Sequence, residues 1–525
     1  MTKSRDIFSP WLAFSGAFLA ALIFALTCRY PGYVHHDTSE IAMWSTLGWP
    51  LGLPKHPPFL PWLFRAYSNV VPLNWISLDV LTAANIVLGA WAVWRIALLV
   101  LDERRASLAL MLYGLAPAGT FFALKLNHNA ILVALWPLTI LAFLSCLRAE
   151  RMTRSLAWGV AFGVLAAVSM LAKYYSGVLL ACCFAASLVS SDRNRFYTMP
   201  GGYAAVAAFA ALIAPHALWM LDNQGATLAY ALHETEREAY PLAHFLAVTP
   251  TYLLPSLAAF WALQRLERHS SPAGVREQTV NIAFGPVARV PNELKVLAIG
   301  PFVLTALFIA LFKLRGATSW SLPDFCVVPV LLAALLPAIS DDGLARGRRI
   351  AGAALVVIAL TGPVVLIAAF ALRDGNGIEP RAELAAAAGR IYTASTGTGP
   401  RIVAGEPKLA NTAALDIPSR PRAFTNFNLA FAPWVTLDAL AREGLLVLCN
   451  TSDMSCRNSS AAVVPDQVRF VCELALQRRW FGLVGRFISA HIVVVPGQGA
   501  GFNPVHAAAA CTTEGGSVPG LIAKP

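Results

Sequence analysis

Asp37 lies in the first polar stretch of the chain, directly after His36 and three residues before Glu40. Residues three apart share a face on a helix, and the following stretch, 41–44, is apolar enough to lie in a bilayer surface. A carboxylate placed there can act as a general base toward a hydroxyl group. These residues therefore indicate acid–base chemistry at a membrane surface.

Lys55 and His56 stand immediately before two prolines, in the sequence KHPPFLPWLF. The prolines restrict the backbone after His56, and Trp62 is typical of a membrane-interface anchor. A cation pair held at this depth suits a phosphate group, because charge-assisted hydrogen bonds to phosphate are strong. The alternative interpretation is an interfacial helix that begins at the prolines.

Further polar side chains recur at the same ends of the apolar segments. Ionisable groups near membrane depth are costly and indicate function, although each one alone is more often an anchor or a structural hydrogen-bonding group. Together they predict an anionic ligand on one side of the membrane. They are Asn127, His128, Asn129, Lys173, Tyr174, His216, His233 and Arg237.

Motifs for metal or nucleotide binding are missing from the sequence. No HExxH, CxxC pair, Walker sequence or GxGxxG stands in a fitting context. We therefore predict no metal ligand and no cofactor, and leave dependence on a divalent metal open.

Composition makes this a polytopic membrane protein. Of its 525 residues, 57% are hydrophobic and 13% are charged, against about 25% charged in soluble proteins. Segments near the ~20 residues that cross a bilayer predict about eleven helices. They cover 11–28, 78–101, 106–124, 128–147, 155–172, 174–191, 200–221, 244–263, 295–314, 321–340 and 350–372.

Arginines collect in alternate short loops, as in cytoplasmic loops of membrane proteins. With a cytoplasmic N-terminus, the odd number of spans places the tail, 373–525, outside. The net charge of +11 is mostly this bias, so a nucleic-acid partner is not predicted. Segment 11–28 could alternatively be a cleaved signal peptide. The lack of a small-residue cleavage site disfavours this interpretation.

The polar content of the chain predicts four regions. They are a catalytic transmembrane half (1–263) with external loops 29–77 and 222–243, a cytoplasmic linker (264–294), accessory helices (295–372) and an extracytoplasmic α/β domain (373–525). The two halves of the membrane region do not mirror each other, which disfavours a transporter built from repeats.

Alternating short apolar runs and helical patterns predict the α/β domain. The expected strands are 401–406, 445–449 and 491–496, and the expected helices are 380–393, 435–443 and 470–480.

The tail also holds four cysteines, an even number that suggests two disulfides in an oxidising compartment. Three pairings are open. Short spacing favours Cys449 with Cys456, which leaves Cys472 with Cys511.

Several blocks of the chain resemble the bacterial lipid-linked glycosyltransferases of the C-type fold. The superfamily includes protein O-mannosyltransferases, the aminoarabinose transferase of lipid A and galacturonosyl transferases of the lipopolysaccharide core. The blocks run from Asp37 to Pro58 and include KLNHNAILVALWPLT (125–139), 156–180 and APHALWMLDN (214–223). The resemblance implies that Asp37 is the base or orienting carboxylate and that His56 contacts the donor phosphate. Many members have Asp-Glu at this point, whereas Thr38 follows Asp37 here, which leaves the role of Glu40 open.

The resemblance implies inverting transfer of a sugar from a polyprenyl phosphate to a lipid or glycan acceptor at the outer face of the bacterial inner membrane. Lys55, His56 and Lys173 would cradle the phosphate, and the remaining polar groups would contact acceptor or sugar. The alternatives are a protein acceptor, a lipid or solute transporter, and a phosphoethanolamine transferase. Charged residues through the whole depth of the bilayer would indicate a transporter. A metal site with a threonine nucleophile would indicate a phosphoethanolamine transferase. The tail could instead be a recognition module for a protein.

Overall fold

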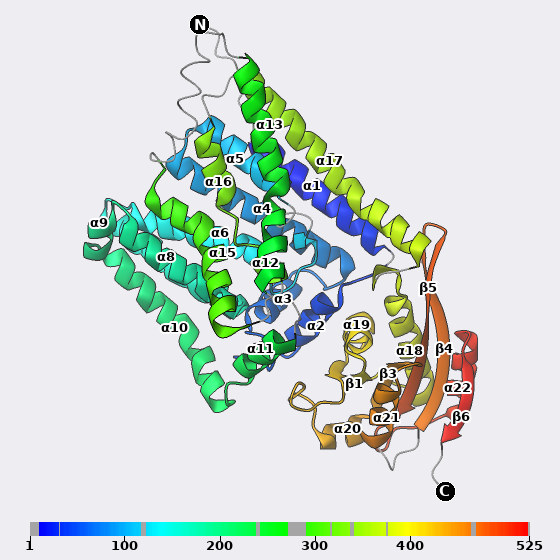
Figure 1. The fold of residues 1–525 in the computed structure, drawn as a ribbon. Helices are drawn as coiled ribbons and strands as arrows, with labels where there is room; N and C mark the ends of the chain where they lie inside the picture. Colours follow the sequence, from blue (N-terminus) through cyan, green and yellow to red (C-terminus); the bar gives the residue numbers. More distant parts are fainter. Residues whose placement is uncertain are drawn as a thin grey trace. The chain divides into compact units, whose positions relative to one another are not determined.

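The computed structural model describes residues 10–30, 32–116, 122–237, 242–270, 290–314, 318–336, 341–373, 376–463 and 469–522. The chain forms two compact units (Figure 1). Unit 1 consists of Met1–Phe24, Leu51–Phe59 and Asp79–Leu360, and unit 2 consists of Ala25–Pro50, Leu60–Leu78 and Thr361–Pro525. The polar stretch between the first two membrane helices is thus divided between the units.

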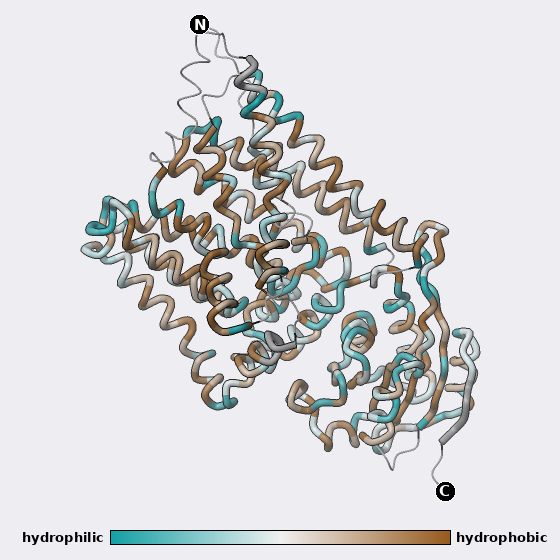
Figure 2. The backbone as a smooth tube through the Cα atoms, in the orientation of Figure 1, coloured by the Kyte–Doolittle hydropathy of each residue, from teal (hydrophilic) through white to brown (hydrophobic). Residues whose placement is uncertain are grey.

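Seven helices of the described chain are long and apolar enough to cross a membrane. They show as long hydrophobic tubes in Figure 2. They are α1 (Pro10–Arg29), α4 (Trp75–Val100), α7 (Met152–Ala172), α10 (Pro200–Asp222), the run of α12 (Leu242–Val248) and α13 (Leu254–Ser270), α15 (Asn292–Phe312) and α17 (Asp341–Leu372).

The expected count of about eleven spans is not confirmed. Four predicted spans correspond to shorter helices, namely α5 (Glu103–Leu115), α6 (Leu132–Leu147), α8 (Gly177–Val189) and α16 (Val328–Leu335). At 1.5 Å per residue, even the 16 residues of α6 span only about 24 Å. Short 3₁₀ turns flank three of these helices: η2 (Phe122–Leu124), η3 (Tyr174–Ser176) and η6 (Thr318–Ser321). Irregular backbone at membrane depth is tolerated where protein buries it or where it lines a cavity.

Small residues bring α7 and α10 together in unit 1. A Cβ on Gly159 would lie 2.1 Å from the carbonyl oxygen of Gly201, and one on Gly163 would lie 2.2 Å from that of Ala205. Two small-xxx-small pairs therefore face each other, which is the usual device for close helix packing in lipid. This contact fixes the N-terminal halves of α7 and α10, next to the short helix α9 (Arg193–Thr198).

Unit 2 contains α2 (His36–Ser45), α3 (Phe59–Ser68) and a mixed α/β domain. Its six-stranded sheet has the order β2-β1-β3-β5-β4-β6, with parallel pairing of β1 to β2 and β3 and antiparallel pairing elsewhere. The strands are β1 (Ile402–Gly405), β2 (Arg422–Thr425), β3 (Leu445–Asn450), β4 (Arg469–Trp480), β5 (Leu483–Val495) and β6 (Ser517–Ile522). The helices are α18 (Arg381–Thr396), α19 (Pro407–Asp416), α20 (Leu437–Glu443), α21 (Met454–Val463) and α22 (Pro504–Thr513).

The predicted helix over 470–480 is wrong, because these residues form strand β4. Glu, Leu, Ala, Gln and Arg favour a helix when taken alone. In the fold, β4 pairs along most of its length with β5 and also with β6. Tertiary pairing therefore overrides local propensity at this segment.

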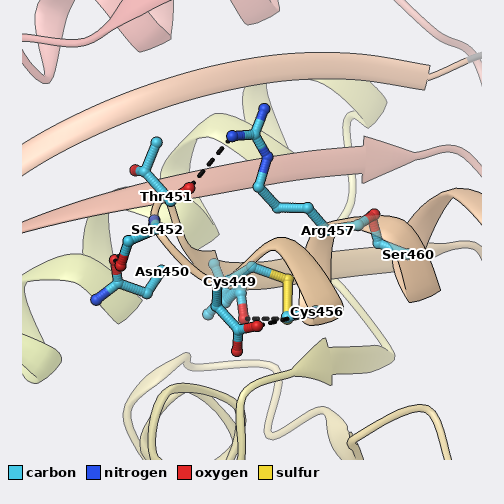
Figure 3. The surroundings of a disulfide bond; sticks show 9 residues. Cys449, Asn450, Thr451, Ser452, Cys456, Arg457 and Ser460 are labelled. Atoms are coloured by element: carbon cyan, nitrogen blue, oxygen red, sulfur yellow. Dashed lines mark hydrogen bonds between the residues drawn. A yellow bond between two sulfur atoms is a disulfide. The ribbon is translucent and has the colours of Figure 1, made fainter.

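The structure contains disulfides Cys449–Cys456 and Cys472–Cys511. The first joins β3 to α21 within one loop (Figure 3), and the second joins β4 to α22. Cysteines in the membrane helices, such as Cys182 and Cys183, are free and buried.

Thiol labelling tests these bridges and the side of the membrane on which they form. In intact spheroplasts, we expect a membrane-impermeant thiol reagent to label the four tail cysteines only after reduction, because disulfides persist in an oxidising compartment. Peptide mapping identifies the labelled sites. Labelling without reductant would contradict the bridges, and labelling only after lysis would contradict the predicted topology.

Candidate active site

The loop that carries Lys55 and His56 is held by side chains of α10 and α11 (Ala226–Arg237). His216 Nδ1 is 2.7 Å from the carbonyl oxygen of Leu51, and Thr227 Oγ1 donates to that of Leu53 over 2.6 Å. Gly52 lies against the Trp219 ring, where a Cβ would come within 2.0 Å of it. Because these contacts fix the loop, His56 is positioned by the helices behind it.

The His56 ring lies over that of His128, with 4.1 Å between ring centroids. His128 is buried and lies just before α6, and its Nδ1 donates to the carbonyl oxygen of Ala172 over 2.9 Å. Tyr230 of α11 adds an edge contact to His56 at 6.0 Å. Two imidazoles from distant parts of the sequence are therefore packed together, with their planes tilted by 30°, at the end of α7.

Lys173 follows α7 directly, at its junction with η3. Its Nζ donates to Asn129 Oδ1 and lies 4.8 Å from the centroid of the Trp320 ring. Asn127 Oδ1 in turn accepts from the backbone N–H groups of Asn129 and Ala130, at 3.0 Å each. Segment 127–130 therefore connects Lys173 with the imidazole pair, and we call His56, His128 and Lys173 the cationic cluster.

Tyr174 and His216 form a second polar pair beside this cluster. The Tyr174 hydroxyl is 2.6 Å from His216 Nε2. Since the carbonyl oxygen of Leu51 can only accept, Nδ1 of a neutral His216 carries the proton and Nε2 accepts from Tyr174. The turn after Lys173 and the loop before Lys55 are thereby joined by one hydrogen-bonded chain.

A buried aspartate that sequence reasoning missed lies behind the same turn. Asp324 is fully buried and accepts from the Tyr175 hydroxyl at 2.8 and 3.0 Å. The Tyr175 ring also stacks on Trp136 at 5.5 Å. An aspartate within a predicted apolar span, 321–340, is itself a functional signal that would have identified it. Asp324 holds the side chain of Tyr175, which lies in the turn that follows Lys173.

In unit 2, Asp37 occupies the first turn of α2. Its carboxylate lies 3.0 Å from His36 Nε2. The Asp37 backbone N–H donates to His35 Nδ1 over 3.3 Å, so His35 is the N-cap residue and its Nδ1 is unprotonated. Glu40 is half-buried one turn later. The carboxylate is thus held at a helix N-terminus, where negative charge is stabilised.

His35, His36 and Asp37 also form a potential metal-binding group. Their ligand atoms all lie within 4.8 Å of one another. Two imidazoles and a carboxylate are suitable ligands for zinc. Sequence reasoning assigned no metal ligand, and the ordinary motif spacings do not include adjacent histidines.

The buried face of α2 packs against α19 within unit 2. Ile41, Met43 and Trp44 supply the largest apolar side chains of α2, each 1–2% exposed. Since full burial of such a side chain contributes about 1.5–3 kcal/mol, the C-terminal domain contributes directly to the position of the helix that carries Asp37.

Asp416, the last residue of α19, gives the domain a pH-dependent stability. Burial raises its pKa from 3.8 to about 7, against the opposing effect of Arg420. The folded protein therefore binds more protons than the unfolded chain between about pH 4 and pH 7, and stability falls as pH rises through that range.

We expect Asp416→Asn to raise the melting midpoint at pH 8 by about 2 °C or more and to reduce its dependence on pH, because the uncharged side chain has no ionised form to desolvate. Thermal melts of the purified protein at pH 4.5 to 8 measure this. Asp438→Asn is the control, since Asp438 is exposed. A lower midpoint at pH 8 than in the wild type would contradict the expectation.

His56, Asn127, His128, Asn129, Lys173, Tyr174 and His216 are thus brought together in unit 1, with Lys55 half-buried in the same loop. His36, Asp37 and Glu40 belong to unit 2. The side chains of His233 and Arg237 lie outside the described residues.

Comparison with known proteins gives a sequence match and a structural match. A sequence model of the dolichyl-phosphate-mannose-protein mannosyltransferases matches residues 55–219. The fold is similar to crystal structures of ArnT from Cupriavidus metallidurans, in the apo state and bound to undecaprenyl phosphate. Each has a TM-score of 0.61 and 14% identity, over 93% of this chain and 98% of that chain. The chain has the C-type glycosyltransferase fold. No curated protein matches its sequence.

The C-type fold confirms the fold class expected from the sequence blocks, namely a helical membrane protein with a small C-terminal α/β domain. The matched segment, 55–219, runs from Lys55 to Trp219 and includes the whole cationic cluster. The match therefore covers the residues whose contacts are described above.

Proposed function

We propose that this protein is an integral membrane glycosyltransferase that moves a sugar from a polyprenyl phosphate donor to a lipid acceptor, such as lipid A or the lipopolysaccharide core. The cationic cluster carries the proposal. Within a C-type fold, it places two imidazoles and an ammonium group at one break between membrane helices. A phosphate on a lipid tail needs such positive charge at the bilayer surface.

The proposed reaction is a single inverting displacement. The acceptor hydroxyl oxygen attacks the anomeric carbon, and Asp37 takes the hydroxyl proton. The bond from that carbon to the phosphate oxygen breaks, and its electron pair leaves with the polyprenyl phosphate. Lys55, His56 and Lys173 stabilise the charge on this leaving group. Glu40, Asn127 and Tyr174 are proposed to contact acceptor or sugar.

Two observations support a lipid-phosphate donor. One ArnT structure with this fold is bound to undecaprenyl phosphate. The family whose model matches 55–219 is named for a mannosyl donor on dolichyl phosphate. That family name also favours a second candidate, a protein O-glycosyltransferase, with the same donor chemistry.

We further propose that the protein lies in the bacterial inner membrane with its catalytic groups and C-terminal domain in the periplasm. The basic cytoplasmic loops and the two tail disulfides support this orientation.

Mass analysis of the cell envelope tests the proposed function. Cells with and without the gene are compared for lipid A, core glycolipids and envelope glycoproteins. One sugar increment missing from a glycolipid supports the lipid acceptor, and one missing from a protein supports the second candidate. Transfer by purified protein from polyprenyl phosphate sugars then confirms the donor. No transfer from any polyprenyl phosphate sugar, with no missing increment, would overturn the proposal.

A further inference from the structure

The hairpin between β4 and β5 ends in exposed apolar side chains. Phe481 is 72% exposed, Phe487 63% and Val484 44%. Exposed Arg479 and Arg486 alternate with them. Aromatic side chains flanked by arginines are typical of protein segments at the boundary between lipid tails and headgroups.

Contacts with α1 place this hairpin tip at the end of a membrane helix. Trp480 Nε1 donates to the carbonyl oxygen of Thr27 over 2.8 Å, and the Phe481 ring stacks on Tyr30 at 5.3 Å. Helix α1 has 20 residues and is therefore about 30 Å long, the thickness of the hydrocarbon core. Its last turn, which includes Thr27, lies at the edge of that core.

Contacts with α17 give the same depth. The Trp480 ring stacks on Phe370 at 5.8 Å and shares an apolar cluster with Leu366. Leu366 lies six residues before the end of α17 at Leu372, which is about 9 Å along the helix. Figure 1 shows the hairpin tip beside this end of α17. The tip therefore lies beside the last turns of α17, on the hydrocarbon side of the helix end.

Hydrogen bonds from the buried Arg478 side chain hold the hairpin at this depth. The Arg478 guanidinium donates to the carbonyl oxygens of Cys28 at 3.0 Å and Tyr30 at 2.5 Å, and also to that of Gly377. Gly485 has no room for a side chain, since a Cβ would lie 2.6 Å from the carbonyl oxygen of Ile378. A guanidinium that satisfies three carbonyls at the ends of helices makes the attachment specific.

We propose that the tip of the β4–β5 hairpin, residues 479–487, is a membrane anchor of the C-terminal domain. Phe481, Val484 and Phe487 enter the outer boundary of the bilayer, and Arg479 and Arg486 reach lipid phosphates. The partner is the phospholipid surface itself. This inference depends on the membrane helices and not on the proposed glycosyl transfer, so each can fail without the other.

Photo-crosslinking in lipid nanodiscs tests the anchor. p-Benzoylphenylalanine replaces Phe481 or Phe487 in the full chain, and nanodiscs of phosphatidylethanolamine and phosphatidylglycerol are irradiated. Leu437 and Val505 are the matched control positions, since they are 67% and 72% exposed on the same domain. We expect lipid adducts, detected by mass spectrometry, at the two hairpin positions and several-fold fewer at the controls. Equal lipid adducts at all four positions, or none at 481 and 487, would overturn the anchor.

Hydrogen exchange provides a second measurement on a folded variant. In nanodiscs, the backbone amides of 479–487 should exchange several-fold faster in the double variant Phe481→Ser, Phe487→Ser than in the wild type. The amides of β3, which is buried, should exchange at the wild-type rate in both proteins. In detergent without a bilayer, the difference should shrink. Wild-type exchange of 479–487 in nanodiscs would count against insertion.

Discussion

Asp37→Asn is expected to reduce sugar transfer by about 10²–10⁴-fold, because the amide cannot accept the proton that the proposed reaction removes from the acceptor. Asparagine has nearly the same shape, and the buried side of α2 does not include residue 37. The variant should therefore fold and insert as the wild type does. The measurement is initial rate with purified enzyme and a polyprenyl phosphate sugar.

Asp438→Asn is the matched control for this variant. Asp438 is an exposed carboxylate on α20 whose only described ion pair, with Arg442, lies on the surface. We expect it to retain wild-type activity. Activity of Asp37→Asn within a few-fold of wild type would remove Asp37 from the role of base, and loss of insertion would point to a structural role.

The second large effect is expected at the cationic cluster. Lys173→Ala should weaken use of the donor by about 10- to 150-fold in kcat/KM, because a hydrogen bond to a charged group contributes about 1.5–3 kcal/mol. The loss should appear when donor concentration is varied, with little change in saturation by the acceptor. Lys173→Arg should recover part of it, since Arg keeps the charge but changes the geometry.

His56 allows the charge and the packing to be separated. His56→Phe keeps a ring that can stack on His128, whereas His56→Ala removes both ring and nitrogen atoms. If His56 contacts the donor phosphate, the two variants should lose donor use to a similar extent. Recovery in the Phe variant alone would assign His56 to packing.

Lys295→Ala is the control for both cations. Lys295 lies in the first turn of α15 in unit 1, where it bonds Asn292 over 3.1 Å. We expect its donor kinetics to match those of wild type. Unchanged donor kinetics in Lys173→Ala and His56→Ala as well would leave the cluster without the proposed role.

In the membrane region, the sequence predicts where helices occur better than it predicts where they begin and end. Long apolar runs such as 200–221 predict helix α10 well, because lipid leaves a spanning segment almost no other backbone structure. The run 174–191 looks equally apolar, yet its helix begins only at Gly177 and its first residues form a turn. Hydropathy does not distinguish a helix of full membrane length from a shorter one that follows a turn.

In the tail, short apolar runs predicted some strands correctly, but local propensity predicted the wrong structure for one segment. Strands β1 and β3 were predicted from short apolar runs and occur where expected. Segment 470–480 was predicted as a helix and is a strand, since its neighbours in space, β5 and β6, come later in the sequence. Asp324 could have been identified as an aspartate within a predicted apolar span, but only the fold shows its contact with Tyr175, which is 149 residues away.

The sequence by itself determined the membrane-bound character, the C-type fold and the residue types available for chemistry. The membrane-bound character follows from composition and from the length of the apolar segments, and the C-type fold was implied by the resemblance of several sequence blocks to the lipid-linked glycosyltransferases. Tertiary structure alone decided that His56 packs against His128, that Lys173 bonds Asn129 and that α2 packs on α19. Such contacts join segments far apart in sequence, and they depend on the packing of whole helices, which no single segment specifies.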